Sequence, residues 1–192
     1  MQATTLFSLT GKTALITGGG SGIGFAIAQT LAAAGARIIL AARREGQLAE
    51  ATQQLIQQGA QARYCCADVT QMAALQDLAR ESADADILVN AAGVNLRQPF
   101  EEVTEAGWDQ QLSLHLKAPF FLTQALAPHM VLRSWGRTIN IASPQSQRAF
   151  DNSAPYAAGK GVRKSVVDGT GVDVGGRRVI NKQSSRRSSW WA

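Results

Sequence analysis

Short apolar segments alternate with longer segments of mixed apolar and polar residues from residue 12 to about residue 142. The short segments predict strands, because they end in turn-forming or polar residues. These strands are expected at 13–17, 37–42, 62–67, 86–90 and 138–142. The mixed segments predict helices near 22–34, 45–58, 71–83 and 105–132. This alternation predicts an α/β fold, a doubly wound parallel sheet with helices on both faces.

A glycine-rich turn, GGGSGIG at 18–24, joins the first predicted strand to an apolar helix. Glycines let the backbone approach a pyrophosphate, and a helix N-terminus supplies N–H groups that lack partners within the helix. A Walker-type phosphate loop would need Lys and then Ser or Thr after the last glycine, where Phe25 and Ala26 stand. The strand and helix around the turn therefore favour dinucleotide binding over a plain tight turn.

The second predicted strand ends in Ala41, Ala42, Arg43 and Arg44, about 20 residues beyond the glycines. An acid at this place would hold the ribose hydroxyls of NAD and repel the 2′-phosphate of NADP. A guanidinium instead binds that phosphate through paired, charge-assisted hydrogen bonds. We therefore expect NADP as the cofactor, with NAD as the alternative. In the other interpretation, both arginines are solvated residues that lead into the next helix.

Three polar residues near the end of this region form a candidate catalytic site. Ser143 follows the last predicted strand, and Tyr156 and Lys160 share a face if their segment is helical. A free tyrosine has a pKa of about 10, and a nearby ammonium favours the phenolate. Ser143 can then hold a substrate oxygen while Tyr156 exchanges its proton and a nicotinamide exchanges hydride. A lone Tyr-x-x-x-Lys is typical of an ordinary helix surface, but the upstream motifs make this site the favoured one.

The order of these motifs resembles the short-chain dehydrogenase/reductase family. The resemblance covers about residues 9–160, through TGGGSGIG, ADV at 67–69, NAAG at 90–93, INIAS and YAAGK. It implies a Rossmann-type fold and an NAD(P)-dependent oxidoreductase that interconverts a secondary alcohol and a ketone. Within the family, the chain is most similar to gluconate 5-dehydrogenase-like members, whose substrates are sugars, sugar acids or polyols.

The resemblance also implies roles for individual residues. The cofactor phosphates are expected beside Gly18, Ser21, Gly22, Ile23 and Gly24, the adenine beside Asp68 and Val69, and the rest of the cofactor beside Asn90, Tyr156 and Lys160. Arg43 marks a preference for NADP. Ser143, Tyr156 and Lys160 match the catalytic serine, tyrosine and lysine. Family members are usually homodimers or homotetramers through the helices around 105–132 and from 156 onward.

His115 departs from the family pattern, because it stands where the family has a catalytic asparagine. The family asparagine supports a proton relay through water. If the relay uses the backbone carbonyl, histidine preserves it, and if the relay depends on side-chain hydrogen bonds, histidine disturbs it. In a third interpretation, His115 is only packed and hydrogen-bonded.

Composition and charge limit the other possibilities. The chain has 192 residues, of which 45% are hydrophobic, and is expected to be one soluble, cytoplasmic domain that binds no membrane. Its net charge is +5, but residues 1–160 hold 12 of the 19 basic and 12 of the 14 acidic residues, so the excess lies in 161–192. The neutral region 1–160 indicates no nucleic acid partner. The adjacent Cys65 and Cys66 predict neither a disulfide nor a metal site.

Residues 161–192 do not follow the family pattern. The glycines of DGTGVDVGG disfavour a helix, and KQSSRRSSWW is typical of a disordered basic end. We expect a dinucleotide-binding domain at 1–160 and an atypical basic tail at 161–192, with the C-terminal strands and helices missing or replaced after a change of coding frame. The alternative function is a truncated, inactive family member that at most binds nucleotide. A tail that binds RNA or a membrane is a further alternative.

Overall fold

The structure is a computed structural model that describes residues 7–148 and 150–161. Its centre is a parallel sheet of five strands in the order β3-β2-β1-β4-β5. The strands are β1 (Thr13–Thr17), β2 (Arg37–Ala42), β3 (Ala62–Cys66), β4 (Ile87–Asn90) and β5 (Arg137–Asn140). The chain runs outward from β1 to β3 and returns to β4 on the other side of β1, so the strand order reverses between β1 and β4. Ligands of doubly wound sheets bind at such a reversal.

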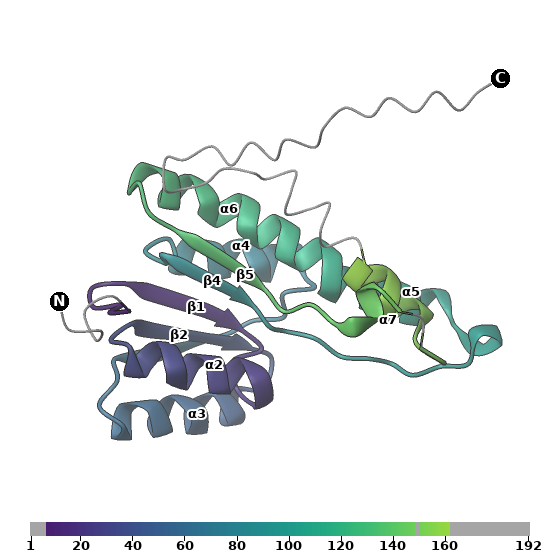
Figure 1. Ribbon diagram of the computed structural model, residues 1–192, viewed down its shortest axis with the longest axis horizontal. Helices are drawn as coiled ribbons and strands as arrows, with labels where there is room; N and C mark the ends of the chain where they lie inside the picture. The colour runs from purple at the N-terminus through teal and green to yellow at the C-terminus, as the bar shows by residue number, and fades with distance from the viewer. Residues whose placement is uncertain (1–6, 149, 162–192) are drawn as a thin grey trace.

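Helices cover both faces of the sheet (Figure 1). Helices α2 (Gly22–Ala33) and α3 (Glu45–Gln57) pack on one face, and α4 (Met72–Glu81) and α6 (Ala118–Leu132) pack on the other. The remaining helical segments are α5 (Glu105–Leu112), α7 (Ala154–Gly161), the π-helical turn η2 (Ser113–Lys117) and the 3₁₀ turns η1 (Phe100–Glu102) and η3 (Pro144–Ser146). The predicted doubly wound α/β fold is confirmed.

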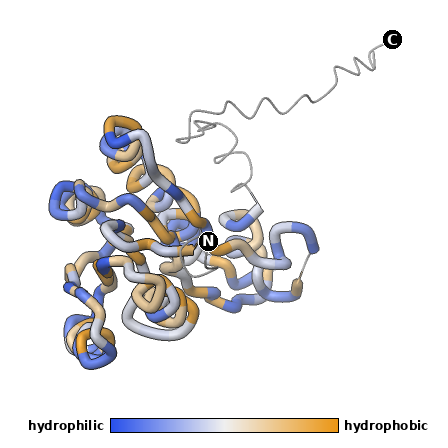
Figure 2. Tube along the Cα trace, turned by 60° about the vertical axis from the view of Figure 1, so that its left-hand side comes forward, coloured by the Kyte–Doolittle hydropathy of each residue, from blue (hydrophilic) through white to orange (hydrophobic). Residues whose placement is uncertain are grey.

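The three central strands β1, β2 and β4 are buried on both sides, as the uninterrupted apolar residues of β2 and β4 predict, whereas the edge strands β3 and β5 are more exposed. Leu15, Ile39 and Leu88 pack with α4 and α6, whereas the next residue of each strand packs with α2 and α3. Figure 2 shows hydrophilic residues on the outer turns of the peripheral helices. In the described part of the chain, no helix is both long and apolar enough to cross a membrane.

The last strand is shorter than the sequence predicted. Strand β5 ends at Asn140, because its partner β4 ends at Asn90 and these two residues are opposite each other. Ser143 therefore lies beyond the strand, where its side chain caps η3 by accepting a hydrogen bond from Gln145 N at 3.2 Å. The predicted basic tail, apart from Gly161, lies outside the described residues.

Candidate active site

The glycine turn between β1 and α2 is closely packed. Gly18 and Gly22 have positive φ values of 68° and 56°, which L side chains rarely adopt. A Cβ atom on Gly24 would lie 2.3 Å from the carbonyl oxygen of Gly18, and one on Gly18 would lie 2.8 Å from Ala92 Cα. The turn therefore fits directly against the start of α2 and the loop that follows β4, which side chains at these positions would prevent.

The start of α2 faces a pocket with a volume of about 360 Å³. It is lined by the glycine turn, the residues after β2 and β3, and the loop after β4. Among the lining residues are Gly18, Ser21, Gly22, Ile23, Gly24, Arg43, Asp68 and Val69, all of which the resemblance assigned to the cofactor. Asn90 instead joins β4 to β5, since its buried amide donates to Asn140 Oδ1 at 2.9 Å.

The sequence analysis missed other residues that line the same pocket. Gln47 lies in the first turn of α3, and a Cβ atom on Gly20 would be 3.5 Å from its Cγ. Ala91, Ala92 and Val94 come from the loop after β4. Ala91 and Ala92 belong to the NAAG motif, but the sequence analysis gave them no role of their own, because small apolar residues after a strand are common in any α/β protein.

One end of the pocket is formed by the residues that follow β2 and β3, and Arg43 and Asp68 lie there. The Arg43 Nη1 atom is 4.0 Å from Asp68 Oδ2, and the Arg43 side chain is 64% exposed. The other oxygen of Asp68 accepts hydrogen bonds from the backbone and hydroxyl of Thr70, at 3.0 and 2.7 Å. Such an exposed ion pair is weak. The carboxylate is thus held in place, while the guanidinium remains accessible to an anion in the pocket.

Helix α7 carries the candidate proton-transfer residues. Tyr156 and Lys160 lie one turn apart, with Lys160 Nζ 5.5 Å from the centroid of the Tyr156 ring. Lys160 is 4% exposed and donates to the carbonyl oxygen of Ile141 at 2.8 Å. The His115 ring also contacts Tyr156, with 4.8 Å between the two ring centroids. The structure therefore brings Tyr156, Lys160 and His115 together, and η3, which Ser143 caps, packs against α7.

Hydrogen bonds fasten the start of α7 to the loop after β4. Asn95 Nδ2 donates to Ser153 Oγ at 3.2 Å, and the backbone N–H of Gln98 donates to the Asn152 carbonyl at 3.0 Å. These contacts could not be predicted from the sequence, because isolated polar residues in loops form no recognisable pattern. Within residues 7–148 and 150–161, no group of three or more His, Cys, Asp or Glu side chains could hold a metal ion.

Comparison with known proteins decides the family. The family model described as short chain dehydrogenase matches residues 12–181. The chain belongs to this family. The matched residues continue past Lys160, farther than the motifs alone had indicated.

Sugar-acid enzymes are among the relatives of this short chain dehydrogenase. It is 38% identical over 179 residues to gluconate 5-dehydrogenase of Gluconobacter oxydans, a match that covers 91% of this chain and 70% of the relative. It is 39% identical over 173 residues to 5-keto-D-gluconate 5-reductase of Escherichia coli, covering 88% and 68%. The chain thus spans about 70% of the length of these relatives.

Solved structures agree with the fold. A gluconate 5-dehydrogenase from Burkholderia cenocepacia, in complex with NADP and tartrate, has a TM-score of 0.82 at 36% identity. The match covers 88% of this chain and 68% of that one. A 3-oxoacyl (acyl-carrier-protein) reductase from Agrobacterium tumefaciens, with NADP bound, has a TM-score of 0.85 at 33% identity, covering 91% and 69%.

Proposed function

We propose that this short chain dehydrogenase is an NADP(H)-preferring oxidoreductase that interconverts a secondary alcohol and a ketone. Its substrate is a sugar, a sugar acid or a polyol. The observation that carries this proposal is the glycine-lined pocket with Arg43 at one end, together with Tyr156 and Lys160 on one face of α7. The names of its relatives support the substrate class, and NADP in the similar solved structures supports the cofactor.

The pocket fits a dinucleotide. The first turn of α2 lines the pocket and holds no acidic residue, and the Ser21 side chain makes no cap hydrogen bond, so this helix end suits an anion. The closely packed Gly18 and Gly24 permit the backbone to approach a pyrophosphate, and Arg43 suits a 2′-phosphate. When bound, a nicotinamide dinucleotide supplies hydride transfer.

Tyr156 is the general acid and base of the proposed reaction. As a phenolate it takes the proton from the alcohol oxygen during oxidation, and as a phenol it returns that proton to the carbonyl oxygen during reduction. The Lys160 ammonium lies 5.5 Å from the centroid of the Tyr156 ring, so a positive charge stands beside the group that exchanges the proton. The Ser143 hydroxyl donates a hydrogen bond to the same substrate oxygen and so fixes its place beside Tyr156.

The decisive experiment measures NADPH binding to the purified chain and then oxidation of a panel of sugar acids and polyols. We expect binding and turnover, and we expect Tyr156→Phe to lower kcat by about 10²- to 10⁴-fold while the Kd for NADPH stays unchanged. Unchanged turnover in Tyr156→Phe would remove Tyr156 from the mechanism. Binding with no turnover of any substrate would support the alternative, an inactive family member that retains a nucleotide site.

Assembly as a homodimer or homotetramer is part of the proposal. Helices α5 and α6 carry two aromatic side chains that are partly exposed, Trp108 at 40% and Phe120 at 37%. Association through these helices would cover both side chains. Light scattering after size-exclusion chromatography tests the assembly, and a monomer at all protein concentrations would contradict it.

A further inference from the structure

His115 lies at the centre of the contacts between the pocket and helix α7. It belongs to the π-helical turn η2, and the structure buries it completely. Turns of this kind often mark functional sites, because they interrupt the regular α-helical spacing. The planes of the His115 and Tyr156 rings meet at 85°, with 4.8 Å between their centroids. This is the edge-to-face geometry that aromatic pairs prefer.

The His115 ring also binds the loop that lines the pocket. Its Nε2 atom lies 2.7 Å from the carbonyl oxygen of Val94. The backbone N–H of Val94 lies 3.4 Å from the same nitrogen, so the imidazole contacts the Val94 backbone in either tautomer. Gln111 supports both the ring and the loop. With its amide oriented to satisfy its neighbours, its nitrogen lies 2.7 Å from the Val94 carbonyl oxygen and 3.3 Å from His115 Nε2, and its oxygen accepts from Leu96 N–H at 2.8 Å. The histidine is therefore oriented by the loop and touches Tyr156 with its ring.

Two glycines leave the space that the His115 side chain occupies. A Cβ atom on Gly159 of α7 would lie 2.9 Å from His115 Cβ. One on Gly93, in the loop after β4, would lie 3.0 Å from His115 Cε1. Both distances are shorter than ordinary carbon contacts, so the imidazole fills the gap between the loop and the catalytic helix.

We propose that His115 is a positioning residue, which holds the Tyr156 ring at a fixed place relative to the loop that lines the pocket. The inference rests on the proposed function, because it assigns Tyr156 the proton transfer. The ring contact, the Val94 hydrogen bond and the fit between Gly93 and Gly159 all act on one side chain. An asparagine at this position would be smaller and would lack the ring, so it could not make the contact with Tyr156.

The contact itself is tested by NMR, independently of activity. The chain has two histidines, so His129→Asn leaves the His115 imidazole as the only histidine signal. His129 is exposed at the end of α6, which makes this variant a suitable background. In that background, Tyr156→Leu removes a neighbouring aromatic ring and should shift the imidazole signals, whereas Tyr156→Phe should leave them near their original place. Unshifted signals in Tyr156→Leu would overturn the proposal.

The consequence for catalysis is tested with three substitutions of His115. We expect His115→Ala and His115→Leu, which both lack a ring, to lower kcat by about tenfold or more, because a small misplacement of a reacting group is costly. The substrate KM and the Kd for NADPH should change far less. His115→Phe keeps a ring in the gap and should recover most of the lost kcat, and His129→Ala should match the original chain.

Each outcome of these experiments decides something specific. Equal kcat in His115→Ala and the original chain would overturn the proposal, as would a His115→Phe variant no better than His115→Ala. If His115→Ala does not fold, the kcat of His115→Leu is compared with that of His115→Phe, and equal values would overturn the proposal. If the original chain binds NADPH but turns over no substrate, the proposed function fails, and the NMR result still decides whether His115 holds Tyr156.

Discussion

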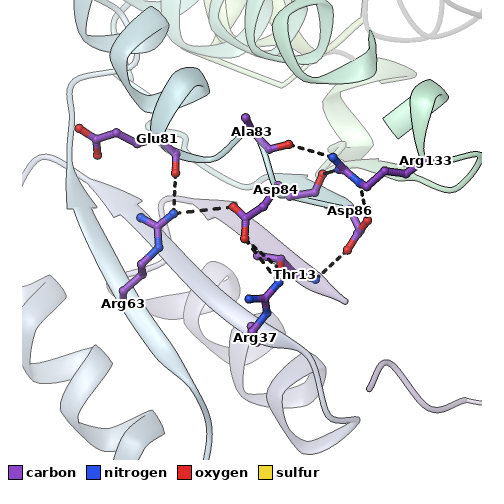
Figure 3. A network of polar contacts seen from close by, with 9 residues as sticks. Thr13, Arg37, Arg63, Glu81, Ala83, Asp84, Asp86 and Arg133 are labelled. Atoms are coloured by element: carbon purple, nitrogen blue, oxygen red, sulfur yellow. Dashed lines mark hydrogen bonds and ion pairs between the residues drawn. The ribbon is translucent and has the colours of Figure 1, made fainter. Parts of the chain in front are cut away.

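Arg133 binds Asp86 at the amino-terminal ends of the strands, opposite the pocket, with Arg133 Nε 3.1 Å from Asp86 Oδ1 (Figure 3). The Asp86 side chain is 8% exposed, and its other oxygen accepts from Thr13 N–H at 3.1 Å. The guanidinium also donates to the carbonyl oxygens of Ala83 at 3.0 Å and Ala85 at 2.6 Å. This pair joins the end of α6 to the first residues of β1 and to the segment before β4.

Replacing Arg133 by alanine should lower the free energy of unfolding by about 3 kcal/mol, because it leaves the buried Asp86 carboxylate uncompensated. Urea denaturation measures this loss. Arg80→Ala is the matched control, since Arg80 pairs with Asp77 on the exposed face of α4 and should cost less than about 1 kcal/mol. Equal losses in the two variants would mean that the buried Arg133–Asp86 pair stabilises the fold no more than the exposed Arg80–Asp77 pair.

Gly24→Ala should damage both folding and nucleotide binding. Its Cβ atom would lie 2.3 Å from the Gly18 carbonyl, so the turn and the start of α2 must move apart. Gly46→Ala is the control, because a Cβ atom at that position in α3 meets open space and alanine favours a helix by about 1 kcal/mol. Thermal unfolding and NADPH titration should show a loss in the first variant and a slightly higher Tm in the second. Unchanged NADPH binding in Gly24→Ala would contradict the close packing of the turn.

The fold was predictable from the sequence because local patterns determine it. Short apolar segments bounded by polar or turn residues identified all five strands, and the spacing of Tyr156 and Lys160 placed both on one face of α7. Features that depend on distant partners could not be predicted. The end of β5 is set by the end of β4, and the contact of His115 with Tyr156 depends on a π-helical turn and on room left by Gly159. None of these has a periodicity of its own in the sequence.

Arg43→Ala should reduce the preference for NADPH over NADH. The Arg43 guanidinium faces the pocket and can make charge-assisted hydrogen bonds to a 2′-phosphate, which are worth about 1.5–3 kcal/mol, or roughly 10- to 100-fold in Kd. We expect the Kd for NADPH to rise by this factor and the Kd for NADH to change little. Titrations followed by cofactor fluorescence measure both constants, with Arg80→Ala as the control for loss of a positive charge. An equal rise in the Kd for NADPH and the Kd for NADH would mean that Arg43 does not bind the 2′-phosphate.

The two neighbouring cysteines should differ in reactivity. Burial raises the pKa of the Cys65 thiol, and a hydrogen bond from its Sγ to Glu81 Oε2 at 3.4 Å adds to the rise. Cys66 points to the other side of β3 and is exposed. Because the thiolate is the nucleophile, a maleimide reagent should modify Cys66 first and Cys65 much more slowly. Mass spectrometry of Cys66→Ser should show only the slow reaction, and fast labelling of that variant would contradict the burial of Cys65.

The same rise in pKa predicts how stability depends on pH. Because the pKa of the Cys65 thiol is higher in the folded chain, the protonated thiol contributes to the stability of the folded state. This contribution is complete at pH values below the pKa of the unfolded thiol, about 8.5. This contribution is lost as the pH rises toward the folded pKa, because the unfolded chain ionises first. Urea denaturation between roughly pH 8 and pH 10 should therefore show a decrease in stability that is smaller in Cys65→Ser than in Cys66→Ser. An identical pH dependence in both variants would mean that ionisation of Cys65 is not linked to unfolding.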